Sequence, residues 1–232
     1  MGLLVKLFND ASDTDFKLAQ DLVAIAMADG EILEAERKVI AEICQKEGIS
    51  NETMNDCLLG FDRAACNPVP NKRRDKTDYL TKLIRVMGVD GYSSHMEIYL
   101  LELIASKMGV GHLELVSLVL MTATRRNFPG ETGANTLASF LKNVIDPKSK
   151  SLRDNRDNIR KMFDLMAENI PQLQDEEEDK AVFMKAMNKA TELLKENTLL
   201  IHEFRTMGID FEAVLAEERE LAIKRWMMTL KH

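Results

Sequence analysis

The chain has 232 residues, of which 45% are hydrophobic, 30% are charged and 6% are aromatic, and its formal net charge is −7. This length and hydrophobic content are sufficient for a buried core over one or two domains, and they exclude a wholly disordered chain. The acidic balance argues against nucleic acid as a partner, because binding to a phosphate backbone requires a basic surface.

Residues 3–8 at the N-terminus are largely apolar and predict a short amphipathic helix that packs on the core, or that contacts a membrane peripherally. No stretch has the roughly 18 consecutive apolar residues of a membrane span, so we expect no integral membrane segment. The three cysteines, Cys44, Cys57 and Cys66, are too few for a disulfide scaffold and are expected to be reduced. Together these features predict a soluble, cytoplasmic protein.

Helical periodicity follows the chain almost from end to end, whereas alternating strand patterns are nearly absent. Apolar residues recur every three or four positions, as in Leu18, Leu22 and Ile25 and again in Leu80, Leu83, Ile84 and Met87. Prolines lie between these segments, where they end helices without kinking them. The sequence therefore predicts an all-α fold, with an exposed linker at residues 67–76.

A second joint at residues 147–151 divides the chain into a helical domain over 1–146 and an appended C-terminal helical domain over 152–232. For the latter we expect three helices, of which the middle one is long and covers about 175–207. Its apolar positions alternate spacings of four and three, and Asn197 interrupts them as a polar residue that sets register would. Two interpretations stay open: packing within one chain, or a homo-oligomer formed through these helices. The last helix is predicted to be capped by Asp210.

An internal repeat carries the most information. When the chain is shifted by 61 residues, a segment at about 15–50 aligns with one at about 76–111 without a gap. Asp29 and Gly30 meet Asp90 and Gly91, Glu36 meets Glu97, and the apolar stripes of both segments coincide. We interpret this as a duplicated helix–turn–helix bundle in which each copy supplies one Asp-Gly corner.

Each corner brings carboxylates to a helix–helix turn. Gly30 and Gly91 allow the positive φ that reverses the chain, and Glu36 and Glu97 lie in the first turn of the outgoing helix, where the helix dipole favours an anion. Such a group of oxygens suits a hard divalent cation. The alternative is structural: Ser94 and Glu97 form a capping box, although Leu33 cannot act as the equivalent side-chain cap in the first copy.

The residues of the first corner resemble the TerB-like family, which is named for tellurite resistance: Met27-Ala28-Asp29-Gly30-Glu31-Ile32, followed by Glu36. Val89-Asp90-Gly91 with Glu97 is similar to the second copy. The resemblance implies an all-helical bundle and a role in binding or sensing a divalent metal ion (Ca²⁺, Mg²⁺, Mn²⁺ or Zn²⁺) during stress. It implies Asp29, Glu36, Asp90 and Glu97 as metal ligands, with Glu31 and Glu34 as outer acids. Tyr92 and His95 stand where a symmetric second copy would repeat these outer acids.

The sequence contains no recognisable pair of nucleophile and base and no metal–histidine motif, so no motif in it indicates an enzyme. The sequence therefore predicts a non-enzymatic, TerB-like protein that binds a divalent cation in a stress or metal response. The alternative is a helical adaptor that contacts a protein partner through residues 152–232 and uses its acidic residues only as helix caps.

Overall fold

The structure is a computed structural model that describes residues 13–60, 70–91, 93–128, 152–169 and 176–229. Within these residues all regular structure is α-helical, which confirms the predicted all-α class. In chain order the helices are α1 (Asp13–Ala26), α2 (Glu34–Lys46), α3 (Asn51–Leu58), α4 (Arg73–Met87), α5 (His95–Lys107), α6 (His112–Arg126), α8 (Leu152–Asn169), α9 (Glu176–Lys195), α10 (Thr198–Thr206) and α11 (Phe211–Thr229). The segments at residues 3–8 and 147–151, for which a helix and a joint were predicted, lie outside the described residues, as does Cys66.

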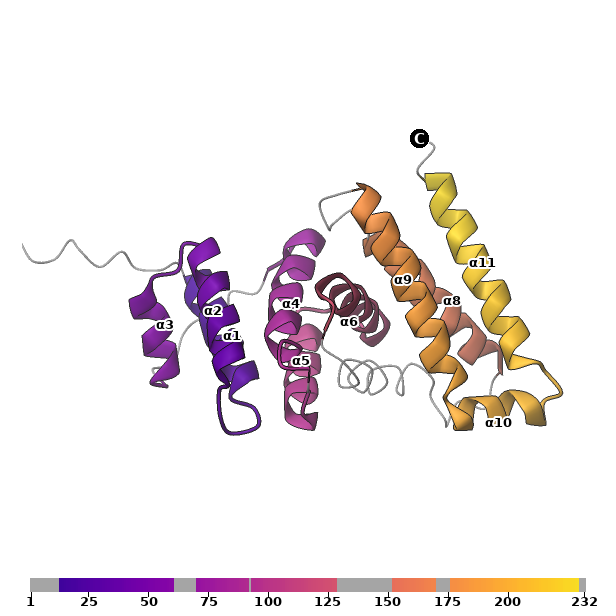
Figure 1. Ribbon diagram of the computed structural model, residues 1–232, viewed down its shortest axis with the longest axis horizontal. Helices are drawn as coiled ribbons and strands as arrows, with labels where there is room; N and C mark the ends of the chain where they lie inside the picture. The colour runs from indigo at the N-terminus through magenta and orange to yellow at the C-terminus, as the bar shows by residue number, and fades with distance from the viewer. Residues whose placement is uncertain (1–12, 61–69, 92, 129–151, 170–175, 230–232) are drawn as a thin grey trace, which may run out of the picture.

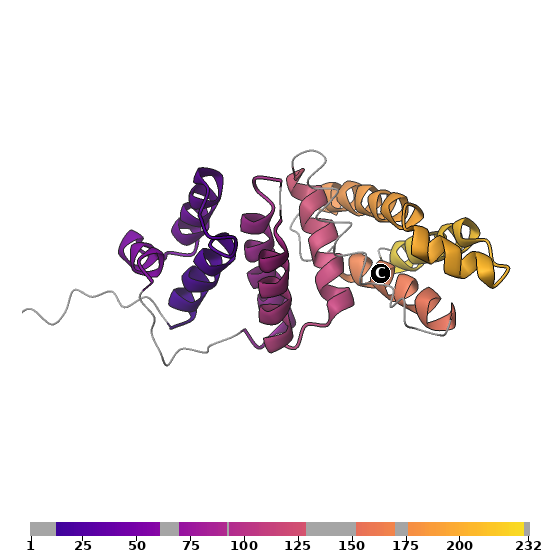
Figure 2. The ribbon, with the colours of Figure 1, turned by 90° about the horizontal axis from the view of Figure 1, so that it is seen from below.

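The helices form three groups along the molecule: α1–α3 at one end, α4–α6 in the middle and α8–α11 at the other end (Figure 1). Seen from below, α6 lies between the α4–α5 pair and the C-terminal helices (Figure 2). Residues 115–123 of α6 are all buried, because this helix packs against α4, α5, α8 and α9. A helix that is covered on every side needs few polar residues, and α6 accordingly joins the two ends of the molecule through one continuous core. None of the described helices is long and apolar enough to cross a membrane.

The first six helices recur at the offset found in the sequence. Helix α5 begins and ends 61 residues after α2 begins and ends, and α6 begins 61 residues after α3. The turns that close the two segments share their hydrogen bonds: the Ile49 N–H donates to the Cys44 carbonyl (2.8 Å), and the Val110 N–H donates to the Ala105 carbonyl (2.9 Å). Both turns therefore reverse the chain with the same backbone geometry.

A buried carboxylate joins α11 to α8 at the other end of the molecule. Glu218 has no exposed side-chain surface, and its oxygens accept hydrogen bonds from Arg156 Nε (2.6 Å) and Arg160 Nε (2.7 Å). The Arg160 hydrogen bond, together with that of Arg156, holds the pKa of Glu218 below its ordinary value despite burial. This pairing offsets the cost of enclosing the charge and fixes the two helices in register.

The prediction of one long helix over 175–207 is wrong. Helix α9 ends at Lys195 and α10 begins at Thr198, so the described C-terminal part has four helices rather than three. Asn197 is the N-cap of α10, and its Oδ1 accepts a hydrogen bond from the Leu200 N–H (3.2 Å). A short amide side chain competes with helix continuation by bonding to the backbone ahead of it. Asn197 thus acts as the cap at which a new helix begins, and not as a polar residue inside one long helix.

Other sequence predictions for this part are confirmed. The seam residues Phe183, Met187, Ala190 and Leu194 are all buried in the chain's own core. Asp210 caps α11, since its Oδ1 accepts from the Glu212 N–H (3.0 Å) and the Ala213 N–H (3.3 Å). The predicted linker at 67–76 is too long, because α4 already begins at Arg73.

Gly88, at the end of α4, packs directly under the ring of Phe128. A Cβ added at Gly88 would lie 1.8 Å from Phe128 Cε2, whereas one added at Gly111 would meet no atom within 4 Å. We predict that Gly88→Ala lowers the free energy of unfolding by about 1–3 kcal/mol through overpacking, while Gly111→Ala, at the N-cap of α6, loses only the capping preference of glycine over alanine and costs less than about 1 kcal/mol. Urea unfolding of both variants measures this, and equal effects would contradict the close packing at Gly88.

Candidate cation site at the two acidic corners

Each Asp-Gly corner is a tight turn that depends on its glycine. Gly30 has φ 110° and Gly91 has φ 84°, a backbone conformation that side chains penalise. The Gly30 N–H donates to the Met27 carbonyl (3.0 Å), and the Gly91 N–H donates to the Gly88 carbonyl (3.3 Å). The predicted role of both glycines is confirmed: they let the incoming helix stop and the chain turn toward the next.

The glutamate of each corner reaches back to the start of its own helix. Glu36 Oε2 accepts a hydrogen bond from the Leu33 N–H (2.8 Å), and Glu97 Oε2 accepts one from the Ser94 N–H (2.5 Å). In the second corner Ser94 Oγ also accepts from the Glu97 N–H (3.2 Å), which completes a capping box. Leu33 offers no side-chain acceptor, so the first corner has only half of this arrangement. The capping role predicted for these glutamates is therefore present at both corners.

Both glutamates are buried, which is unusual for carboxylates that have no cationic partner among the described residues. Glu36 is 4% exposed and Glu97 is 3% exposed. Burial is the main reason that their pKa values are raised, and for Glu97 the pKa reaches about 7. The backbone hydrogen bonds at Leu33 and Ser94 oppose this rise but do not cancel it.

The two corners share one electrostatic environment. The charge of Glu36 raises the pKa of Glu97, and Asp29 raises the pKa of both glutamates. Asp90, from the second corner, raises the pKa of Glu36 in the first. This coupling arises because α1 packs against α4 and α5, and α2 packs against α4. All four predicted ligands are thus brought to one region of the fold.

The four carboxylates do not form a closed cage. Asp29 and Asp90 are exposed, and the outer acids Glu31 and Glu34 are exposed as well. Among the described residues, no three side chains of His, Cys, Asp or Glu are placed so that they could hold one metal ion. The arrangement therefore offers an ion two buried carboxylates and two exposed ones around the turns, and not a preformed set of three or more ligands.

A buried polar contact between α1 and α4 was not anticipated from the sequence. Tyr79 Oη donates a hydrogen bond to Asp21 Oδ2 (2.7 Å), and Lys17 pairs with the same carboxylate. Burial and the Asp21 charge raise the pKa of Tyr79 well above its usual range, so the phenol stays protonated. Asp21 directly precedes Leu22 of the apolar stripe, and this charged residue beside a core position is the signal that could have identified it. The contact joins the helices that lead into the two corners.

Comparison with protein-family models, with curated proteins and with solved structures gave no match. The TerB-like resemblance therefore rests on the corner residues alone, and it stays a prediction.

The raised pKa of Glu97 predicts a specific dependence of stability on pH. The folded state binds this proton more tightly than the unfolded state, so the free energy of unfolding should fall as pH rises from about 4.5 to about 7. Glu97→Gln keeps an oxygen that can accept from the Ser94 N–H but carries no charge. We expect this variant to match the wild type near pH 4.5 and to exceed its free energy of unfolding by up to about 3 kcal/mol at pH 8.

Urea unfolding at a series of pH values measures this difference. Glu192→Gln is the matched control, because Glu192 is exposed on α9 and its removal should leave the pH profile of the wild type intact. A Glu97→Gln profile parallel to that of the wild type would show that Glu97 is not the group that titrates.

Proposed function

We propose that the chain is a non-enzymatic protein that binds a divalent cation at the two acidic corners, through Asp29, Glu36, Asp90 and Glu97, in a metal or tellurite stress response. The observation that supports this most is the burial of Glu36 and Glu97 from two separate helix–turn–helix segments within reach of each other's charge. Two like charges placed together in a region of low dielectric repel each other, and a cation between the corners would relieve that repulsion. The TerB-like resemblance of the same four residues points to the same chemistry.

The donor set favours a hard cation that keeps much of its water. Zinc sites use three or four protein ligands, commonly Cys and His, and such a set is not assembled among the described residues. Mg²⁺ retains several water molecules and is held through one or two carboxylates, while Ca²⁺ accepts carboxylate, carbonyl and water oxygens in flexible geometry. The corner carboxylates suit either ion.

The four residues would have different roles in this site. Glu36 and Glu97 each use one oxygen to cap a helix, so they would act mainly through their charge and not as direct ligands. Asp29 and Asp90 are exposed on the turns and can rotate toward an ion without disturbing the core. The aspartates would therefore supply direct contacts, and the glutamates would supply the field that attracts the cation.

Thermal unfolding in the presence of MgCl2, CaCl2 or MnCl2 tests the proposal, because a ligand bound only by the folded state must raise the midpoint. At tenfold excess over Kd we expect a gain of about 1.4 kcal/mol, or roughly 3 to 6 °C for a chain of this size. Asp29→Asn combined with Asp90→Asn should abolish the shift.

Two controls separate a bound ion from general charge screening. NaCl at equal ionic strength should not reproduce the shift, and Glu192→Gln combined with Glu196→Gln removes the same charge from two exposed positions, one on α9 and one directly after its last residue. A shift that persists in the Asp29 and Asp90 double variant, or no shift with any of the ions, would contradict a cation site at the corners.

The second candidate function, a helical adaptor, is favoured by exposed methionines on α11. Met227 is 48% exposed and Met228 is 68% exposed, and methionine surfaces adapt readily to partner surfaces. If α11 joins two copies of the chain, sedimentation should show concentration-dependent association that Met227→Ser combined with Met228→Ser weakens and that a chelator does not affect. Monomers at all concentrations would contradict self-association through α11.

A further inference from the structure

A cavity of about 420 Å³ opens between α2, α4 and α6, away from the acidic corners. Along α2, Lys46 in the cavity wall lies ten residues beyond Glu36, which corresponds to about 15 Å of helix. The α4 side of the cavity is a polar stripe that includes Thr77, Thr81 and Arg85, which are four residues apart and so share one face. We call this cavity the basic groove.

The basic groove carries an excess of positive charge in a chain that is acidic overall. Its wall includes six basic side chains and three acidic ones. The basic residues are Lys46, Arg74, Lys82, Arg85, Arg125 and Arg126. The volume of about 420 Å³ falls within the range of small-molecule sites.

Two of the three acidic residues are already engaged by one lysine. Lys82 Nζ lies 2.9 Å from Glu47 Oε2 and 2.5 Å from Asp78 Oδ2. By contrast, none of the described carboxylates lies within ion-pair distance of Lys46, Arg74 or Arg126. The excess positive charge is thus carried mainly by side chains that no described acid neutralises.

Arg85 and Arg126 face the same space. Arg85 has 19% of its side chain exposed, and its described ionic contact is to Glu42 at 4.0 Å. Burial, followed by the nearby charge of Arg126, lowers the pKa of Arg85 from its usual value. Arg125, next to Arg126, lies 3.8 Å from the mostly exposed Glu178. These guanidinium groups repel one another, and an anion between them would attract them and offset that repulsion.

The side chains that line the basic groove indicate which class of ligand it would bind. Guanidinium groups bind phosphate oxygens through paired hydrogen bonds, and four of the six basic residues are arginines. The hydroxyls of Thr77, Thr81 and Thr122 add neutral hydrogen-bond donors to the same wall. We propose that the basic groove binds a small ligand that carries two or more phosphate groups.

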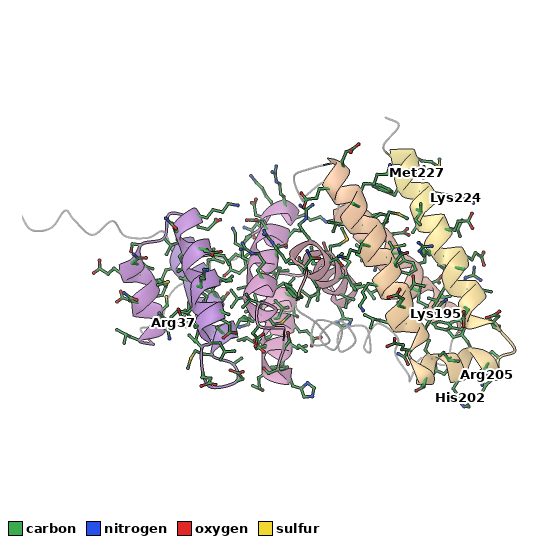
Figure 3. The ribbon with its side chains drawn as sticks, in the orientation of Figure 1. Arg37, Lys195, His202, Arg205, Lys224 and Met227 are labelled. Carbon is green, nitrogen blue, oxygen red and sulfur yellow. The ribbon has the colours of Figure 1, made fainter. Side chains whose placement is uncertain are left out.

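A second basic group in the chain is less suited to this role. Lys195, His202 and Arg205 lie around α10, in the C-terminal group of helices (Figure 3). The cavity there is smaller, about 170 Å³, and Lys195 is paired with Glu212 at 3.2 Å. This group serves as an internal control for attraction of anions by any basic surface.

Calorimetric titration of the full chain with inorganic tripolyphosphate tests the proposal, with EDTA present so that divalent cations at the corners take no part. We expect saturable binding with one ligand per chain, and a loss of affinity of at least about tenfold in Arg126→Gln and in Arg85→Gln. Arg126 is exposed, so its variant should retain the fold even if Arg85→Gln does not, and circular dichroism checks both. Arg37→Gln on α2 and Arg205→Gln on α10, both exposed and outside the basic groove (Figure 3), should bind as the wild type does.

The source of the phosphate groups is distinguished by a second arm with phosphatidylcholine vesicles that contain phosphatidylinositol bisphosphate. Co-sedimentation that is lost in Arg126→Gln would assign the basic groove to a lipid headgroup, and tripolyphosphate binding without co-sedimentation would assign it to a soluble phosphorylated molecule. No saturable tripolyphosphate binding at about 1 mM would overturn the proposal. Equal weakening in all four variants, or preferential binding of single-stranded RNA, would overturn it as well.

Discussion

The helix caps made by Glu36 and Glu97 are the constraint on which the N-terminal half of the molecule depends. The first N–H groups of a helix have no partner within it, and each corner satisfies the N–H of its N-cap residue with a glutamate three residues ahead. The same solution places two carboxylates in the interior, where α1 and α2 meet α4 and α5. Local capping and long-range repulsion are therefore two consequences of one placement. The pKa of Glu97 is raised because burial, together with the charges of Glu36 and Asp29, outweighs the hydrogen bonds that it accepts at Ser94.

The rest of the structure is organised around α6, which lies between the helices of the second corner and the C-terminal helices and packs against both. Its buried stretch contacts α4 and α5 on one side and α8 and α9 on the other. At the far end, Glu218 is buried as deeply as the corner glutamates, but it is paired with Arg156 and Arg160. The comparison shows two outcomes for a buried carboxylate: the pKa of Glu218, which is paired with arginines, is lowered, whereas the pKa values of Glu36 and Glu97, which have no described cationic partner, are raised.

Much of the fold was predictable because it is encoded locally. Apolar spacing identified the helices, the Asp-Gly pairs identified the turns, and Ser94 and Asp210 were recognised as caps. The break at Asn197 was missed because the apolar spacing continues through it: Leu194 and Phe204 are both buried, although they belong to different helices. Periodicity alone cannot distinguish a polar residue inside a seam from a cap that ends one helix and begins the next.

The sequence by itself determined the helical class and the residues of both acidic corners, because these depend on side-chain spacing within a few turns of one chain segment. Only the tertiary structure decided that Glu36 and Glu97 are buried within reach of each other's charge and that no three described ligands enclose an ion. It also decided that Lys46, Arg85 and Arg126, distant in sequence, line one cavity. Burial and charge density arise where helices from different parts of the chain meet, and no local pattern specifies them.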